Sequence, residues 1–168
     1  MIKKIKNSYF LTFKKRNILR IGIYFYIYMK LTSFPIGIFD SGVGGTSIWK
    51  EIKTLLPNEN IIYLSDSKNA PYGEKSKQEI IDLSIKNTEY LLQKVCKLIV
   101  VACNTATTNA IKILREKYAI PFIGIEPAIK PAAIQTKTNN IGILATKGTL
   151  NSALFEKTTN TITKKITT

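Results

Sequence analysis

The sequence contains no histidine and only two cysteines among its 168 residues. Without histidine, the chain cannot build a Ser-His-Asp triad, a Cys-His dyad or a histidine-ligated metal site from its own residues. Two cysteines are too few for a disulfide scaffold, and the spacing from Cys96 to Cys103 fits no zinc pattern. Acids are also scarce, because 11 Asp and Glu stand against 25 Lys and Arg, a net charge of +14.

The basic charge is concentrated at the start of the chain. Residues 1–28 hold Lys3, Lys4, Lys6, Lys14, Lys15, Arg16 and Arg20, and no acid. The segment ends in an apolar stretch, residues 18–29, interrupted by Arg20. This stretch is shorter than the roughly 20 apolar residues that span a bilayer, and it lacks a small-x-small cleavage site. We interpret residues 1–28 as an extension outside the fold, with a natural start at Met29. A membrane-associating tail and a nucleic-acid-binding tract are the alternatives.

From residue 29 onward, apolar runs alternate with helical patterns. We predict strands at 35–39, 61–64, 98–102, 122–125 and 141–145, and helices at 46–56, from Ser76 onward, at 104–117 and at 128–135. Strands that are apolar on both faces and alternate with helices predict a parallel sheet covered on both sides. The fold class is therefore α/β, doubly wound and flavodoxin-like. The tail after Glu156 is low in complexity, and we expect it to be frayed.

Small polar groups follow the predicted strands, and ligands bind at the carboxyl ends of the strands in an open parallel sheet. Cys103 lies between a strand and a helix N-terminus, whose free N–H groups and dipole favour a thiolate. An inert buried cysteine is the alternative. Asn104 and Thr105 add donors suited to a carboxylate or phosphate, although helix capping explains either residue alone.

Two further segments fall on the same edge of the sheet. Asp40 opens a glycine-rich turn that is neither a Walker loop nor a full dinucleotide fingerprint. Its carboxylate can cap the next helix, or it can tune proton transfer beside the thiol. Residues 71–73 lie in a long polar loop, and such loops are often functional.

Four segments carry a resemblance to a known family. Asp-Ser-Gly-Val-Gly-Gly at 40–45, Ala-Pro-Tyr-Gly at 70–73, Ala-Cys-Asn-Thr-Ala at 102–106 and Gly-Ile-Glu-Pro-Ala at 124–128 occur in this order. Residues 33–155 as a whole resemble bacterial glutamate racemase, of the aspartate/glutamate racemase family. The resemblance implies a cofactor-independent, metal-free cytoplasmic isomerase that interconverts L- and D-glutamate for peptidoglycan, with homodimers as in the family and no nucleic-acid or membrane partner.

The resemblance also implies roles for individual residues. Cys103 matches one of two catalytic cysteines, and Asp40 matches an acid beside it. The substrate-binding positions are Ser41, Tyr72, Gly73, Asn104, Thr105, Thr146 and Thr149. The chemistry agrees, because a tuned thiolate is a plausible base and the carbanion formed at the α-carbon needs electrostatic support.

The chain departs from the family at the second cysteine. Inversion requires a proton donor on the opposite face of the α-carbon, and the family's Gly-Cys-Thr-His segment is missing here. Cys96 lies seven residues before Cys103, on the order of 20 Å away along an extended strand, so it cannot be that donor. We therefore expect residues 29–127 to form the first racemase domain, 128–168 to begin a second similar one, and the chain alone to be inactive. An aspartate racemase and a non-catalytic anion-binding α/β module are the alternatives.

Overall fold

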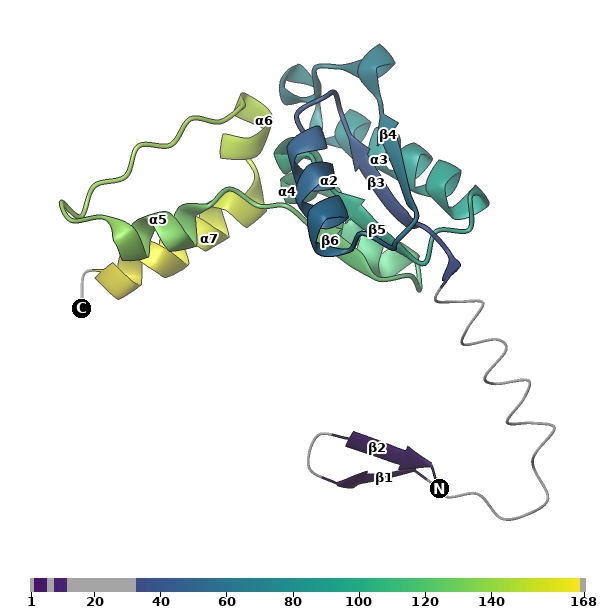
Figure 1. Ribbon diagram of the computed structural model, residues 1–168. Helices are drawn as coiled ribbons and strands as arrows, with labels where there is room; N and C mark the ends of the chain where they lie inside the picture. The colour runs from purple at the N-terminus through teal and green to yellow at the C-terminus, as the bar shows by residue number, and fades with distance from the viewer. Residues whose placement is uncertain (1, 6–7, 12–32, 167–168) are drawn as a thin grey trace, which may run out of the picture. The chain divides into compact units, whose positions relative to one another are not determined.

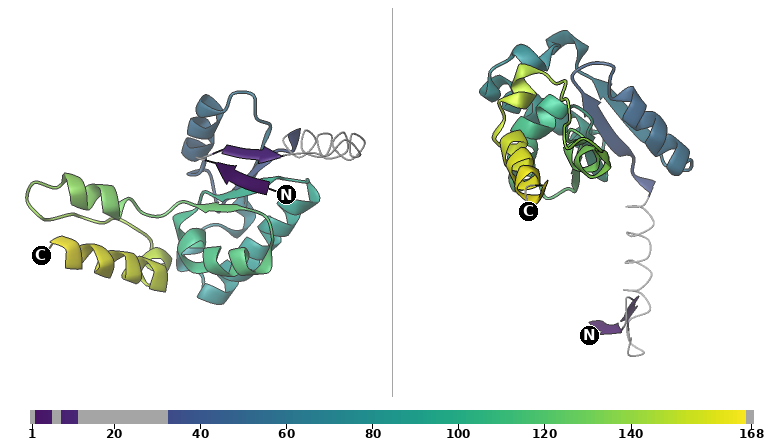
Figure 2. Two further views of the ribbon diagram at one scale, coloured as in Figure 1. Left: turned by 90° about the horizontal axis from the view of Figure 1, so that it is seen from below. Right: turned by 90° about the vertical axis from the view of Figure 1, so that its left-hand side faces the viewer.

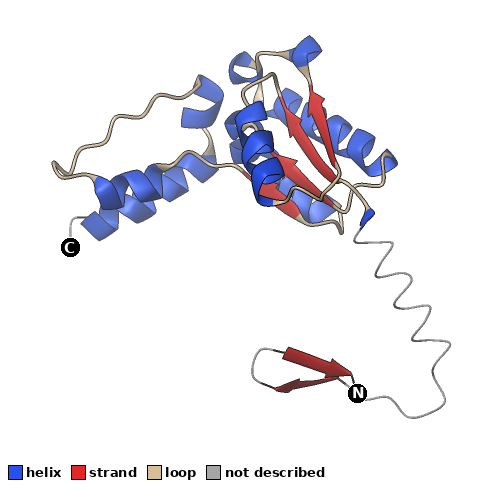
Figure 3. Cartoon of the chain, viewed as in Figure 1, coloured by secondary structure: helices blue, strands red, loops and turns tan. Residues whose placement is uncertain are grey.

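The computed structural model describes residues 2–5, 8–11 and 33–166, and the chain divides into two compact units, Met1–Ser33 and Phe34–Thr168. In the first unit, β1 (Ile2–Ile5) and β2 (Ser8–Leu11) pair antiparallel (Figure 3). Most of the proposed extension, residues 1–28, lies outside the described residues, so its interpretation stays a prediction. No helix among the described residues is long and apolar enough to cross a membrane.

The second unit is built on a parallel sheet. Its strands are β3 (Ile36–Asp40), β4 (Ile61–Ser65), β5 (Leu98–Val101) and β6 (Phe122–Gly124). Their order is β4-β3-β5-β6, and every neighbouring pair is parallel. The predicted α/β class and the first four predicted strands are confirmed. Because the chain reverses its direction of travel across the sheet between β3 and β5, this is the topological switch point where such sheets bind ligands.

Helices cover both faces of the sheet (Figures 1 and 2). On one face, α2 (Thr46–Leu55) packs through Ile48 and Ile52 onto Ile38 of β3. On the other face, α3 (Lys77–Gln93) and α4 (Asn104–Lys117) surround Phe39 of β3 and the Ile99 and Val101 side chains of β5. Successive residues of a strand point to opposite faces, so the unbroken apolar run of β3 supplies both cores.

Local signals set the start of α3 where the sequence predicts it. The Ser76 hydroxyl accepts a hydrogen bond from the Glu79 N–H at 3.3 Å, and the Glu79 carboxylate accepts one from the Ser76 N–H at 2.9 Å. This capping box satisfies two N–H groups that the first turn of a helix leaves free. The loop before it contains two short 3-10 turns, η1 (Ser67–Asn69) and η2 (Tyr72–Glu74).

The predicted fifth strand is wrong for this structure. Residues 141–145 have no regular secondary structure, and Ile143 and Leu144 are exposed. The apolar pattern is that of a buried strand, but a strand needs a neighbour to pair its backbone groups. Among the described residues, β3 to β6 form the whole parallel sheet, and none of them pairs with this segment.

The prediction of a frayed tail is also wrong. Residues after the sheet form α5 (Ile129–Gln135), as predicted, then α6 (Lys147–Leu150) and α7 (Ala153–Ile166), which packs on α5 and α4 (Figure 1). Among residues 153–162 of α7, the positions that are not exposed are Leu154, Phe155, Thr158, Thr159 and Ile162. They share one helical face, and threonine occupies two of them. The Thr159 hydroxyl donates to the Phe155 carbonyl at 2.9 Å, which lets a polar residue lie on an inner face.

Candidate active site

The site begins where β3 and β5 end side by side. Ser41 follows β3, Cys103 follows β5, and the Ser41 hydroxyl oxygen lies 3.4 Å from the Cys103 sulfur, within hydrogen-bonding distance. Sequence analysis predicts that both residues lie on one edge of the sheet, and the structure places them in contact. The pair lies at the switch point, where the two chain crossings diverge and leave room for a ligand.

Cys103 is the N-cap residue of α4. Its sulfur accepts a hydrogen bond from the Ala106 N–H at 3.4 Å, and the residue is only 7% exposed. The thiol is therefore both buried and aligned with the positive end of a helix. Backbone donors and the helix dipole stabilise a negative charge on this sulfur, which is the property a basic or nucleophilic thiol requires.

Asp40 holds the glycine-rich turn in place. Its carboxylate accepts a hydrogen bond from the Gly45 N–H at 2.9 Å, and the residue is buried. Gly45 approaches the sheet so closely that a β-carbon there would lie 2.8 Å from the β-carbon of Ala102. The structure thus places Asp40 in a structural role within the turn, next to the residue that contacts the thiol. A direct part in proton transfer remains a prediction.

Tyr63, near the end of β4, belongs to the site but was not among the predicted residues. Its hydroxyl donates to the Gly42 carbonyl at 3.2 Å. Burial, with the Asp40 and Cys103 charges as further causes, raises the pKa of Tyr63 to about 12. Its phenol therefore stays protonated at neutral pH and remains a hydrogen-bond donor. The only sequence signal was a tyrosine within an apolar strand, which is equally typical of packing.

Three hydroxyl groups gather around Thr105, in the first turn of α4. The Thr105 hydroxyl lies 2.9 Å from that of Thr146 and 3.2 Å from that of Thr149, and the Thr146 and Thr149 hydroxyls are 3.1 Å apart. We call these three residues the threonine cluster. Gly73 lies against it, since a β-carbon on Gly73 would come within 2.6 Å of the Thr146 β-carbon. Four predicted substrate-binding residues are thus brought together.

Asn109 fastens the threonine cluster to α4. Its side-chain amide donates to the Gly148 carbonyl at 2.9 Å and to the Thr105 carbonyl at 2.9 Å. Sequence analysis missed this residue, because nothing local distinguishes it from a solvated helix position. Asn104, which was predicted, is exposed on the first turn of α4, and its amide has no hydrogen-bond partner among the described residues.

Comparison with known proteins assigns the family. A family model described as Asp/Glu/Hydantoin racemase matches residues 36–162, which is most of the chain. This chain belongs to the Asp/Glu/Hydantoin racemase family. It is 49% identical over 123 residues to a glutamate racemase of Ralstonia pickettii (strain 12J), covering 73% of this chain and 44% of that protein. It is 53% identical over 127 residues to one from Clostridium perfringens (strain ATCC 13124), covering 75% and 49%.

Solved structures of the racemase family share this fold. The glutamate racemase of Escherichia coli, in complex with L-glutamate and the activator UDP-MurNAc-ala, superposes with a TM-score of 0.72 at 40% identity, covering 78% of this chain and 50% of that one. The glutamate racemase of Aquifex pyrophilus gives a TM-score of 0.71 at 37% identity, covering 76% and 51%. The chain spans about half the length of the curated relatives it matches.

The other cysteine of this racemase-family chain lies apart from the site. Cys96 is buried before β5, where a β-carbon on Gly37 would come within 3.0 Å of its sulfur, whereas Cys103 follows the same strand. Burial raises the pKa of the Cys96 thiol, so it stays protonated and unreactive. Among the described residues, no cluster of three His, Cys, Asp or Glu side chains is placed to hold a metal ion.

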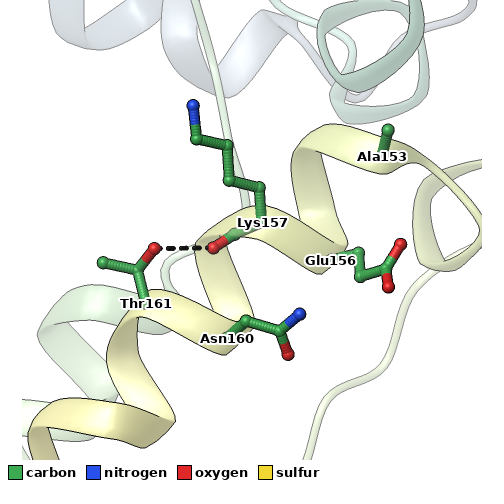
Figure 4. A pocket seen from close by; sticks show the side chains of 5 residues that line it. All are labelled: Ala153, Glu156, Lys157, Asn160 and Thr161. Carbon is green, nitrogen blue, oxygen red and sulfur yellow. Dashed lines mark hydrogen bonds between the residues drawn. The ribbon is translucent and has the colours of Figure 1, made fainter.

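Two hollows lie on the surface beyond the thiol. A cavity of about 980 Å³ adjoins the threonine cluster, with Gly73 and Gly148 in its wall. A smaller pocket of about 360 Å³ is lined by Ala153, Glu156, Lys157, Asn160 and Thr161 of α7 (Figure 4). In that pocket the Thr161 hydroxyl donates to the Lys157 carbonyl at 2.8 Å. None of the predicted site residues lines the smaller pocket, so it plays no part in the site.

Proposed function

We propose that this chain is the part of a glutamate racemase that carries one of its two catalytic thiols, and that Cys103 removes the α-proton of bound glutamate. The observation that carries the proposal is the position of the Cys103 sulfur, at the N-terminus of α4 and 3.4 Å from the Ser41 hydroxyl. Family membership and the glutamate racemases among its relatives support the substrate.

The proton transfer uses groups that surround the sulfur. The thiolate forms an S–H bond with the α-hydrogen, and the electron pair of the broken C–H bond stays on the α-carbon. The resulting carbanion is delocalised into the substrate carboxylate, whose growing charge is stabilised by fixed donors. Asn104 and Thr105 at the start of α4 are suited to that task, and the threonine cluster with Gly73 offers further polar contacts for glutamate.

Inversion needs an acid on the opposite face of the α-carbon. Cys96 is buried at the other end of β5 and is unsuited to that role. We propose that the second thiol is supplied by the part of the relatives that this chain does not match, within a longer product or from a second polypeptide. The completed enzyme would then supply D-glutamate for peptidoglycan in the cytoplasm, as a homodimer.

Thiol labelling tests the proposal on the chain as it is. Iodoacetamide should alkylate Cys103 quickly at neutral pH and Cys96 slowly, with the two peptides resolved by mass spectrometry, and glutamate should protect Cys103. Aspartate should protect less well. Slow labelling of Cys103 in the absence of glutamate, in a chain that still binds glutamate, would indicate the anion-binding module instead. Polarimetry should detect no racemisation of L-glutamate by this chain, and appreciable racemisation would overturn the claim that the second acid is missing.

A further inference from the structure

The carboxylate of Asp66, in the loop after β4, is the centre of a hydrogen-bond network that the racemase assignment does not use. Its Oδ1 accepts from the Asn69 side-chain amide at 2.8 Å, and its Oδ2 accepts from the Tyr72 hydroxyl at 2.5 Å. The Asn87 amide donates to the Tyr72 hydroxyl at 3.0 Å and lies 3.4 Å from the same Asp66 oxygen. Both Asp66 carboxylate oxygens and the Tyr72 hydroxyl are therefore matched to complementary partners.

The network connects three parts of the fold that flank the site. The Asp66 N–H donates to the Asp40 carbonyl at 2.9 Å, which links it to the end of β3. Tyr72 begins η2, and Asn87 projects from α3. Tyr72 is 1% exposed and Asn87 is 6% exposed, so the hydrogen bond between them is shielded from water, while those to the half-buried Asp66 are partly shielded. Networks of this kind hold one geometry, because an unmatched donor or acceptor at the buried end is costly.

The turn that the network holds joins two parts of the site, because Tyr72 belongs to the same buried cluster as Cys103 and the next residue contacts the threonine cluster. Gly73, directly after Tyr72, packs against Thr146. Burial, and after it the Asp66 hydrogen bond, raise the pKa of Tyr72, with the Cys103 charge as a smaller cause, so the phenol stays protonated near the thiol. Because the Tyr72 hydroxyl is engaged on both sides, it is not free to contact a ligand. The side chain anchors the turn.

We propose that Asp66 is a positioning residue of the glutamate site, which acts through Tyr72 to fix the Tyr72–Gly73 turn beside Cys103 and the threonine cluster. The inference rests on the proposed function. A carboxylate is required at position 66 because it only accepts hydrogen bonds. It accepts the hydrogen bond that the Tyr72 hydroxyl donates, and the Asn87 amide donates to a lone pair of the same hydroxyl oxygen. An amide at position 66 has only one acceptor oxygen, so its NH2 group would face a donor of either Tyr72 or Asn69.

Three variants of the full chain test the proposal. Asp66→Asn replaces one of the two acceptor oxygens with an NH2 donor, with little change in shape. Asp82→Asn is the matched control, since Asp82 is an exposed carboxylate on α3 that accepts a hydrogen bond from the Gln78 side chain. The double variant Asp66→Asn with Asn87→Asp exchanges the two partners of Tyr72, so that the hydroxyl again has one acceptor and one donor. The readout is the glutamate concentration that halves iodoacetamide labelling of Cys103, with thermal unfolding measured in parallel.

Asp66→Asn should raise the half-protecting glutamate concentration about tenfold, the usual effect of losing one charge-assisted hydrogen bond. Asp82→Asn should leave it unchanged, and the double variant should recover most of the loss. Recovery of glutamate protection in the double variant distinguishes positioning from general destabilisation. If the substitutions only destabilised the fold, their losses of protection would add. Protection of Asp66→Asn equal to that of the unaltered chain, or no recovery in the double variant, would overturn the inference.

The same measurements separate this inference from the proposed function. If glutamate fails to protect Cys103 in the unaltered chain, the proposed function fails, and the labelling rate without glutamate then decides the inference. Iodoacetamide should label Cys103 severalfold faster in Asp66→Asn than in Asp82→Asn. Cys103 is only 7% exposed in the folded chain, and a loosened turn would expose its sulfur. Equal rates for the two variants would show that Asp66 does not hold the turn beside the thiol.

Discussion

The Ser41 hydroxyl lies 3.4 Å from the Cys103 sulfur, although 62 positions separate the two residues in the sequence. The contact exists because β3 and β5 are hydrogen-bonded neighbours in register, with Phe39 opposite Val101. A hydroxyl that donates to the sulfur adds to the Ala106 N–H in stabilising a thiolate.

Ser41→Ala tests that contact. Loss of the hydroxyl removes one donor from the sulfur, so labelling of Cys103 by iodoacetamide at neutral pH should slow by about tenfold. Ser47→Ala is the matched control, because the Ser47 hydroxyl donates to the Gly44 carbonyl at 2.9 Å on the exposed side of the same turn. An equal rate in Ser41→Ala and the unaltered chain would show that the hydroxyl does not act on the thiol.

Gly73→Ala tests the close approach at the threonine cluster. The added β-carbon would meet Thr146 at 2.6 Å, so α6 must shift, and we expect a loss of stability of about 1–3 kcal/mol together with weaker glutamate protection. Gly142→Ala adds the same atom where no atom lies within 4 Å and should be nearly neutral. Urea unfolding of the two variants measures the difference. Similar effects of both substitutions would contradict the packing described.

Thr149→Val tests the hydroxyl cluster at nearly constant volume. Thr149 is 1% exposed, and its hydroxyl lies within hydrogen-bonding distance of those of Thr105 and Thr146. Removing it should cost about 1–3 kcal/mol by leaving buried partners unmatched. Thr161→Val, on the exposed face of α7, should cost far less. The denaturant midpoints of unfolding of the two variants measure this difference. An unchanged midpoint for Thr149→Val would contradict a stabilising role for the threonine cluster.

Tyr63→Phe should change how stability depends on alkaline pH. The folded-state pKa of Tyr63 is raised from 10.0 to about 12, so folding favours the protonated phenol. That contribution is complete below pH 10 and is lost as pH rises from 10 to 12. The free energy of unfolding, measured with urea at several pH values in this window, should therefore fall less steeply with pH in Tyr63→Phe than in the unaltered chain. Parallel curves would indicate that Tyr63 is solvated like an ordinary tyrosine.

The sequence predicts the sheet and the thiol well because both depend on local signals. The apolar run of β3, the capping box at Ser76 and the strand-to-helix junction at Cys103 each specify their own structure. The partners of Asp66 could not be predicted in the same way. Its contact with Asn87 joins residues 21 positions apart and depends on how α3 packs on the sheet.

The two wrong predictions, a strand at 141–145 and a frayed tail, concern structure that local patterns do not decide. The segment 141–145 has a strand-like pattern, but pairing depends on a neighbour that the pattern does not contain. The tail that forms α7 has few apolar residues, and Thr158 and Thr159 occupy its inner face with Phe155 and Ile162. Its helical period is visible in the sequence only when threonine is counted as compatible with a buried helical face.

Deuterium incorporation at the α-carbon of glutamate tests the central claim most directly. The chain should be incubated in D₂O with L-glutamate and with D-glutamate separately, and the α-hydrogen followed by proton NMR. One enantiomer should lose its α-hydrogen signal without inversion, Cys96→Ser should behave like the unaltered chain, and Cys103→Ser should abolish the exchange. Exchange that persists in Cys103→Ser, or no exchange with either enantiomer, would contradict the assignment of Cys103 as the base.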